Sequence, residues 1–157
     1  MGEVVAADRK SAGLCTLLCL WFAAQTPAQV HANPAEWRTG SLIVTEVRAR
    51  ATPPAVSVGA IYFSITNTGP KADRLLSVST PAADKVELHE SRTVHGVVEM
   101  RAVAAVECPP GATVKSEPGG LHVMLIGLTQ PLRAGTEIPV LLQFRDAGAL
   151  RLKVPVI

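Results

Sequence analysis

Short strand-like runs, interrupted at regular intervals by turn residues, constrain the fold of this chain more than any other feature. Val, Ile, Thr and Leu dominate the runs, and the 12 Gly and 12 Pro residues fall mostly between them. The runs occupy residues 41–52, 56–67, 73–80, 85–91, 96–103, 112–117, 121–128, 137–144 and 149–156. About nine short strands at this spacing predict one all-β domain, an antiparallel β-sandwich.

The N-terminus has the pattern of an export signal. Arg9 and Lys10 precede the apolar stretch SAGLCTLLCLWFAA, which is too short to span a bilayer comfortably, and small residues follow at Val30 and Ala32. We therefore predict a secretory signal peptide cleaved after Ala32, with an uncleaved membrane anchor as the alternative. The predicted organisation is a signal peptide over 1–32, a lead-in over 33–40 and the folded domain over 41–157.

Charge and cysteine content narrow the possible functions. The formal net charge is +2, and the basic residues are scattered, so we expect no nucleic-acid partner. Cys15 and Cys19 would leave with the signal peptide, after which we expect no membrane attachment. Cys108 would then be the one remaining thiol, so an intramolecular disulfide is impossible and the core must be stabilised by packing. We expect Cys108 itself to be a small packed residue.

The run LHVMLIGL places an imidazole and a thioether two positions apart. Residues i and i+2 of a strand point to the same face, so His122 and Met124 should share one face while Val123 and Leu125 fill the core. Taken alone, this pair is compatible with a solvated histidine beside a packed methionine.

A second His/Met pair lies in the segment ELHESRTVHGVVEM, residues 87–100. If this segment is a hairpin whose turn centres on Val94 and His95, His89 stands directly opposite Met100. Directly opposed residues have Cβ atoms about 4.5–5.5 Å apart, which suits two ligands of one ion. The alternative is a coincidence of two common strand residues.

The four side chains together predict a Cu(I) site. The chain has three Met, of which one is the initiator, and both others pair with a His. Neutral thioether sulfur selects soft ions, above all Cu(I), whereas zinc prefers thiolate, imidazole or carboxylate and calcium and magnesium prefer oxygen. A blue-copper electron-transfer site would need a Cys thiolate with two His, and Cys108 shows no such local pattern.

The spacing of His89, Met100, His122 and Met124 resembles the H-x10-M-x21-H-x-M signature of the periplasmic copper chaperones of the PCuAC family. Further similarity extends over residues 48–156, as in VGAIYFSITNTG and PGGLHVMLIGLTQPLRAGTEIPVLL. The resemblance implies a cupredoxin-like, immunoglobulin-like β-sandwich that binds Cu(I) through these four residues. It also implies copper delivery in the periplasm, in particular to the CuA centre of cytochrome c oxidase.

Three features depart from that family or add to it. Many members have Met after the first His, where this chain has Glu90, which should point to the opposite face from His89. The chain ends at KVPVI without the His/Met-rich tail of some members, so we expect no second copper site. His95 falls in the proposed turn, where we expect a solvated residue.

The function that follows is binding and transfer of one Cu(I) per chain, without catalysis. No Ser-His-Asp arrangement and no paired-carboxylate pattern is visible, and we expect a monomer that is not an enzyme. Two alternatives remain open at this point. One is an adhesion or assembly module on the same sandwich, in which both His/Met pairs are incidental. The other is a copper-dependent redox enzyme, which would need an accessible Cu(II) state.

Overall fold

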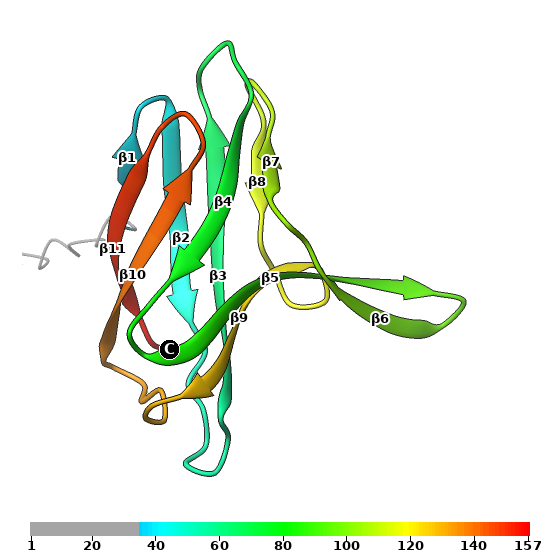
Figure 1. Ribbon diagram of the computed structural model, residues 1–157, viewed down its shortest axis with the longest axis vertical. Helices are drawn as coiled ribbons and strands as arrows, with labels where there is room; N and C mark the ends of the chain where they lie inside the picture. The colour runs from blue at the N-terminus through cyan, green and yellow to red at the C-terminus, as the bar shows by residue number, and fades with distance from the viewer. Residues whose placement is uncertain (1–34) are drawn as a thin grey trace, which may run out of the picture. The chain divides into compact units, whose positions relative to one another are not determined.

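The computed structural model describes residues 35–157, which form two facing antiparallel sheets without a helix (Figure 1). The larger sheet has the order β1-β2-β3-β9-β5-β6, with β8 paired to β3 beyond the end of β9. Its strands are β1 (Trp37–Thr39), β2 (Leu42–Ala49), β3 (Val58–Asn67), β5 (Ala83–Val94), β6 (Val97–Ala102), β8 (Thr113–Lys115) and β9 (Leu121–Leu128). The smaller sheet, β11-β10-β4-β7, comprises β4 (Asp73–Ser79), β7 (Val106–Cys108), β10 (Glu137–Phe144) and β11 (Ala149–Pro155). No helix long and apolar enough to cross a membrane occurs among these residues.

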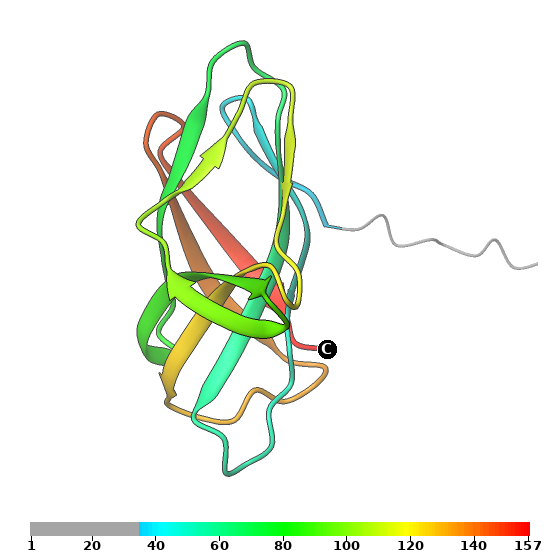
Figure 2. The same cartoon turned by 90° about the vertical axis from the view of Figure 1, so that its right-hand side faces the viewer.

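The core lies between the two sheets and has the period of two that the sequence predicts. Val123 and Leu125 of β9 are fully buried, as are Leu142 and Phe144 of β10 on the facing sheet, and they belong to one continuous apolar cluster. Figure 2 shows the sandwich turned by 90°, with the two layers seen from the side of the β5–β6 hairpin. Because side chains on one strand alternate between faces, this buried set leaves every second residue of β9 on the outer face of the larger sheet.

Two short strands fall outside the predicted runs. β1 lies within the predicted lead-in, where Trp37 pairs with Val44 of β2, and β7 lies before the turn that contains Pro109 and Pro110. Each has three residues, too few for a period of two to be visible in the sequence. The predicted signal peptide, residues 1–32, lies outside the described residues.

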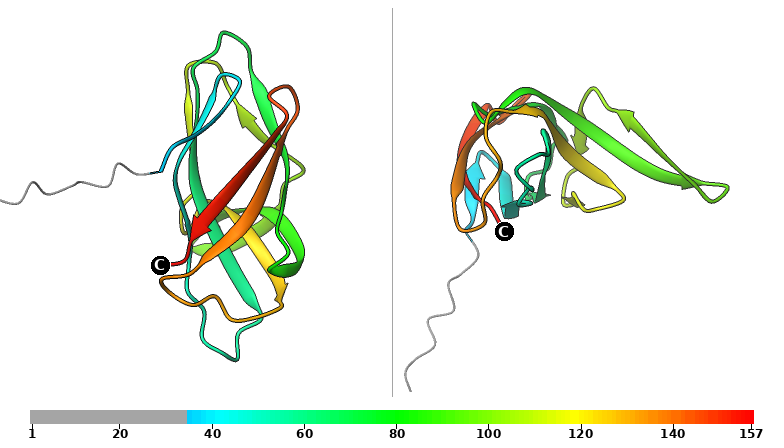
Figure 3. Two further views of the ribbon diagram at one scale, coloured as in Figure 1. Left: turned by 90° about the vertical axis from the view of Figure 1, so that its left-hand side faces the viewer. Right: turned by 90° about the horizontal axis from the view of Figure 1, so that it is seen from below.

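The β5–β6 hairpin extends beyond the sandwich, as the view from below shows most clearly (Figure 3). The first part of β5 pairs with β9, and its last part pairs with β6 alone. All six residues of β6 are exposed, in contrast to the alternating burial of β9 and β10. This hairpin therefore has no facing layer, and its residues are held mainly by the cross-strand ladder.

Candidate metal site

Strand β9 holds His122 and Met124 on the outer face of the larger sheet. Val123 and Leu125 are fully buried in the core, as predicted, so the two side chains between and beside them point the other way. His122 is nevertheless only 8% exposed, and Met124 is half-buried. The imidazole is thus part of a covered surface and is not a freely solvated side chain.

Strand β5 places His89 directly across from His122 in the antiparallel ladder. The two ring centroids are 5.9 Å apart, with the ring planes tilted by 49°. The His89 side chain is 14% exposed. Two imidazoles from different strands therefore stand side by side on one face, an arrangement that the sequence did not predict because it gave no register for β5 against β9.

The register predicted for the β5–β6 hairpin is wrong. The turn centres on His95 and Gly96, because Val94 pairs with Val97 and Ser91 with Met100, while His89 faces Ala102. His95 and Gly96 have φ angles of 51° and 81°, which identifies a two-residue turn with both central residues in the left-handed region. Such turns match the right-handed twist of the flanking strands and favour Gly at the second position.

Met100 nevertheless stays on the same face as His89. The observed pairing differs from the predicted one by two residues, and a shift of two preserves the face whereas a shift of one would reverse it. Met100 becomes a diagonal neighbour of His89, at the roughly 7–8 Å Cα separation typical of such pairs. It is 53% exposed, which makes it the most accessible of the four residues.

The four predicted ligands thus share one continuous outer surface over three adjacent strands. His89 and His122 form its centre, Met124 lies two residues along β9, and Met100 lies on the far strand of the hairpin. Within residues 35–157, no group of three or more His, Cys, Asp and Glu side chains gathers in a way that could hold a metal ion.

Glu87 is a residue of this surface that sequence reasoning missed. It pairs with Met124 across the ladder, and its carboxylate accepts a hydrogen bond from His89 Nε2 at 2.9 Å and contacts Lys85 Nζ at 2.6 Å. Hydrogen bonds from Lys85 and then from His89 hold the pKa of the Glu87 carboxyl below its ordinary value. The signal was available in the sequence, since Glu87 is two positions before His89 and so shares its face.

The nitrogens of the two imidazoles have different surroundings. His122 Nδ1 lies 3.0 Å from the carbonyl oxygen of Gly120, which can only accept, so this nitrogen carries the proton and Nε2 holds the lone pair. His89 bonds Glu87 through Nε2, and its Nδ1 is buried with no hydrogen-bond partner. Each ring therefore has one nitrogen that does not donate a hydrogen bond to a protein acceptor: Nδ1 of His89 and Nε2 of His122.

Where β5 and β6 pair, over residues 89–94 and 97–102, the hairpin has one uncharged face and one charged face. The face that carries His89 and Met100 also carries Ser91, Thr93 and Val98, none of which is charged. On the opposite face, Glu90 contacts Arg92 at 2.9 Å and Arg101 at 3.2 Å. Glu90 therefore points away from His89, as predicted.

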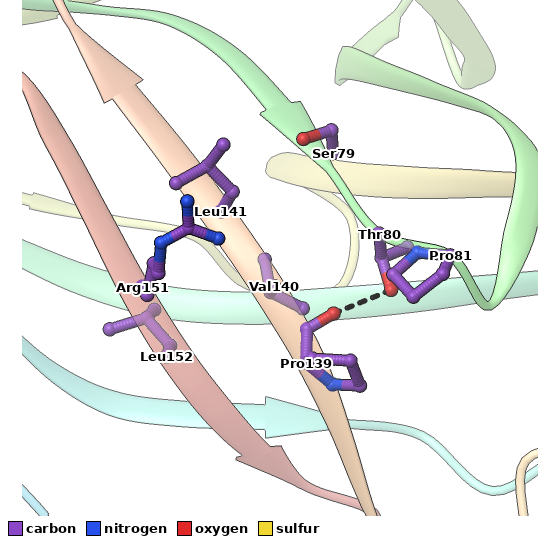
Figure 4. A pocket seen from close by; sticks show the side chains of 8 residues that line it. All are labelled: Ser79, Thr80, Pro81, Pro139, Val140, Leu141, Arg151 and Leu152. Atoms are coloured by element: carbon purple, nitrogen blue, oxygen red, sulfur yellow. Dashed lines mark hydrogen bonds between the residues drawn. The ribbon is translucent and has the colours of Figure 1, made fainter.

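Cys108 lies in β7 of the smaller sheet, fully buried, and burial raises the pKa of its thiol to about 11. His95 is exposed at the hairpin tip. The chain also has a shallow pocket on the smaller sheet, drawn in Figure 4, where the Thr80 hydroxyl donates to the Pro139 carbonyl at 2.7 Å. None of the four candidate ligands lines that pocket.

Comparison with known proteins places the chain among related sequences and structures. A curated relative, "Putative lipoprotein Lxx21020" from Leifsonia xyli subsp. xyli (strain CTCB07), is 37% identical over 98 residues, which is 62% of this chain and 59% of that protein. The chain therefore spans less than two thirds of the length of this relative.

Solved structures share the fold. The "Copper-bound PCuAC domain from PmoF2" superposes with a TM-score of 0.68 at 23% identity, over 78% of this chain and 97% of that one. The solution structure of CuI-DR1885 from Deinococcus radiodurans gives a TM-score of 0.60 at 26% identity, over 81% and 82% of the two chains. The predicted cupredoxin-like antiparallel β-sandwich is confirmed. A family model described as "LpqE-like: Putative lipoprotein LpqE-like" matches residues 42–156, so the chain belongs to the LpqE-like family.

Proposed function

We propose that this protein is a copper chaperone that binds one Cu(I) through His89, Met100, His122 and Met124. The observation that carries the proposal is the direct pairing of His89 on β5 with His122 on β9. Met124 on β9 and Met100 on β6 lie on the same outer face of the sheet. Similarity to a copper-bound PCuAC domain and to the Cu(I) form of DR1885 supports it.

The chemistry of the donor set favours Cu(I) over other metals. Two neutral imidazoles and two neutral thioethers add no negative charge, which suits a soft monovalent ion and suits divalent calcium or magnesium poorly. Met100 is more than half exposed, so a partner's ligand can approach the bound ion from that side. This is the behaviour expected of a carrier that gives up its cargo by ligand exchange.

Export and delivery complete the proposal. The basic and apolar N-terminal pattern and the lipoprotein name of a relative support an exported protein, which in a bacterium with two membranes works in the periplasm. We place its transfer step at a cuproprotein, in particular the CuA centre of cytochrome c oxidase. The protein acts as a monomer, without enzymatic turnover.

The test is competition for Cu(I) against a chelator under anaerobic conditions. The wild type should hold one Cu(I) per chain, and a Met100→Leu/Met124→Leu variant should lose Cu(I) to the chelator, because leucine keeps the volume and removes the sulfur. Cys108→Ala is the matched control: it removes the remaining side-chain sulfur atom of residues 33–157, which is not a proposed ligand, and should bind Cu(I) like the wild type. Equal retention of Cu(I) by the double-Leu variant would make the thioethers packing residues. Absence of Cu(I) binding by the wild type would favour a β-sandwich adhesion or assembly module.

A further inference from the structure

We propose that Glu87 is a positioning residue that fixes the tautomer of His89, so that His89 offers Nδ1 to copper while His122 offers Nε2. The inference rests on the proposed function and adds to it which nitrogen each ring supplies and which residue decides this for His89.

The first step concerns the proton on His89. An ionised carboxylate can only accept hydrogen bonds, so the 2.9 Å contact with Glu87 requires a proton on His89 Nε2. In a neutral imidazole the other nitrogen, Nδ1, then carries the lone pair. The tautomer of His89 is thus set by Glu87.

The second step concerns the lone pair. His89 Nδ1 is buried and has no hydrogen-bond partner within residues 35–157. Buried polar atoms in folded proteins almost always have a partner, and an exception calls for an explanation such as an unfilled ligand position. A copper ion bound to Nδ1 would supply the missing partner.

The third step is the contrast with His122. Its Nδ1 proton is held by the Gly120 carbonyl at 3.0 Å, which leaves Nε2 for the metal. Metal-binding histidines almost always donate their second ring N–H to a carboxylate or a backbone carbonyl, which orients the ring. His89 donates from Nε2 to a carboxylate, and His122 donates from Nδ1 to a backbone carbonyl.

Glu87 supports the site without being a ligand itself. One carboxylate oxygen contacts Lys85 at 2.6 Å and the other contacts His89. Glu87, His89 and His122 do not gather as a group able to hold a metal ion. Both oxygens are occupied, and a hard oxygen is a poor ligand for Cu(I).

The experiment combines histidine nitrogen NMR on the copper-free protein with Cu(I) competition on three variants. Glu87→Leu removes the acceptor, and Glu87→Gln removes the charge but keeps an oxygen that accepts. Glu90→Gln is the matched control, three residues after Glu87 and on the opposite face of β5. In the wild type we expect His89 protonated at Nε2 and unprotonated at Nδ1. Glu87→Leu should give a mixture of tautomers and lower Cu(I) affinity by roughly 10–100-fold, the usual cost of losing such a partner.

The two controls separate positioning from charge. Glu87→Gln should keep the wild-type tautomer and lose less affinity than Glu87→Leu, and Glu90→Gln should match the wild type in both measurements. A His89 that is protonated at Nδ1 in the copper-free wild type, copper bound through His89 Nε2, or full affinity in Glu87→Leu would each overturn the inference. If the wild type binds no Cu(I), the proposed function fails, and the copper-positioning role with it. The NMR measurement reports separately whether Glu87 sets the tautomer.

Discussion

The candidate copper surface has an inner part and an outer part that the fold holds very differently. His89, His122 and Met124 sit where β5 and β9 pair within the sandwich, and each is largely covered. Met100 sits on β6, an edge strand whose residues are all exposed, in a hairpin with no facing layer. On the proposed function, the three covered side chains would be held in place before an ion binds, whereas the exposed Met100 side chain would lose conformational freedom on binding copper.

The difference suggests how a carrier can hold copper and still release it. Ordering an exposed methionine costs side-chain entropy, up to about 1.5–2 kcal/mol, so its sulfur contributes less net affinity than one that is already fixed. We therefore expect the inner three residues to retain the ion and Met100 to be the ligand that a partner replaces first. The uncharged hairpin face around Met100 is where that partner would approach.

Loss of an inner imidazole should have the largest effect. In His122→Asn, an amide can still donate to the Gly120 carbonyl, but the imidazole lone pair is gone. We expect Cu(I) affinity to fall by more than about a hundredfold, or ~2.7 kcal/mol, and weak Cu(II) binding to be lost as well. Chelator competition in both oxidation states measures this, with a thermal melt to check folding. Unchanged affinity would remove His122 from the site.

The two methionines provide the sharpest test of the comparison. Met124→Leu should weaken Cu(I) binding more than Met100→Leu, by roughly tenfold or about 1.4 kcal/mol, because Met124 is held in place and Met100 is not. Each substitution conserves volume, so the free energy of unfolding should change by less than ~1.5 kcal/mol. Cu(I) competition on the two single variants decides the order. If Met100→Leu is the more damaging, the outer part of the site is not the weaker one.

The hairpin tip should affect stability without affecting copper. His95 has a φ of 51°, a conformation that Asn tolerates better than His in this type of turn. We expect His95→Asn to raise the free energy of unfolding by up to about 1 kcal/mol, since turn-compatible substitutions have effects of that size. Cu(I) affinity should remain at the wild-type value. A drop in affinity would make His95 a fifth contact to the ion.

The smallest effect concerns Cys108, which is buried in the smaller sheet and does not lie on the candidate copper surface. Burial raises the pKa of its thiol from 9.0 to about 11, so the folded protein keeps the proton at pH values where the unfolded chain loses it. The stability associated with this thiol is complete below pH 9.0 and declines as pH rises toward about 11. Denaturant unfolding across this range should show the decline in the wild type and not in Cys108→Ala. At pH 8, a thiol reagent should modify Cys108 only after unfolding.

The sequence predicted the inner part of this site better than the outer part. The period of two around Val123 and Leu125 was enough to place His122 and Met124 on the outer face. The pairing of His89 with His122 is a long-range contact between β5 and β9, and no local pattern encodes it. The predicted hairpin register was wrong because the turn was centred on Val94 and His95, whereas it lies one residue later, at His95 and Gly96.

Glu87 shows a different limit of prediction from sequence. Its face followed from its position two residues before His89, but its hydrogen bond to the ring depends on how Lys85 and the tilt of the imidazole orient the carboxylate. Those are properties of the packed side chains. The face predicted for Met100 is nevertheless correct. The error in the turn shifts the strand pairing by two residues, so Met100 pairs with Ser91 in place of His89 and stays on the same face.

X-ray absorption on the protein loaded with one equivalent of Cu(I) tests the central claim most directly. A site built from His89, Met100, His122 and Met124 predicts two nitrogen and two sulfur neighbours around copper. It also predicts that, in competition with a chelator, a second equivalent of Cu(I) remains with the chelator. In Met100→Leu, copper should lose one sulfur neighbour and keep both nitrogens. That result would agree with an ion that stays bound to His89, His122 and Met124 without Met100. A spectrum with oxygen and nitrogen neighbours only, or two equally tight ions per chain, would contradict the account.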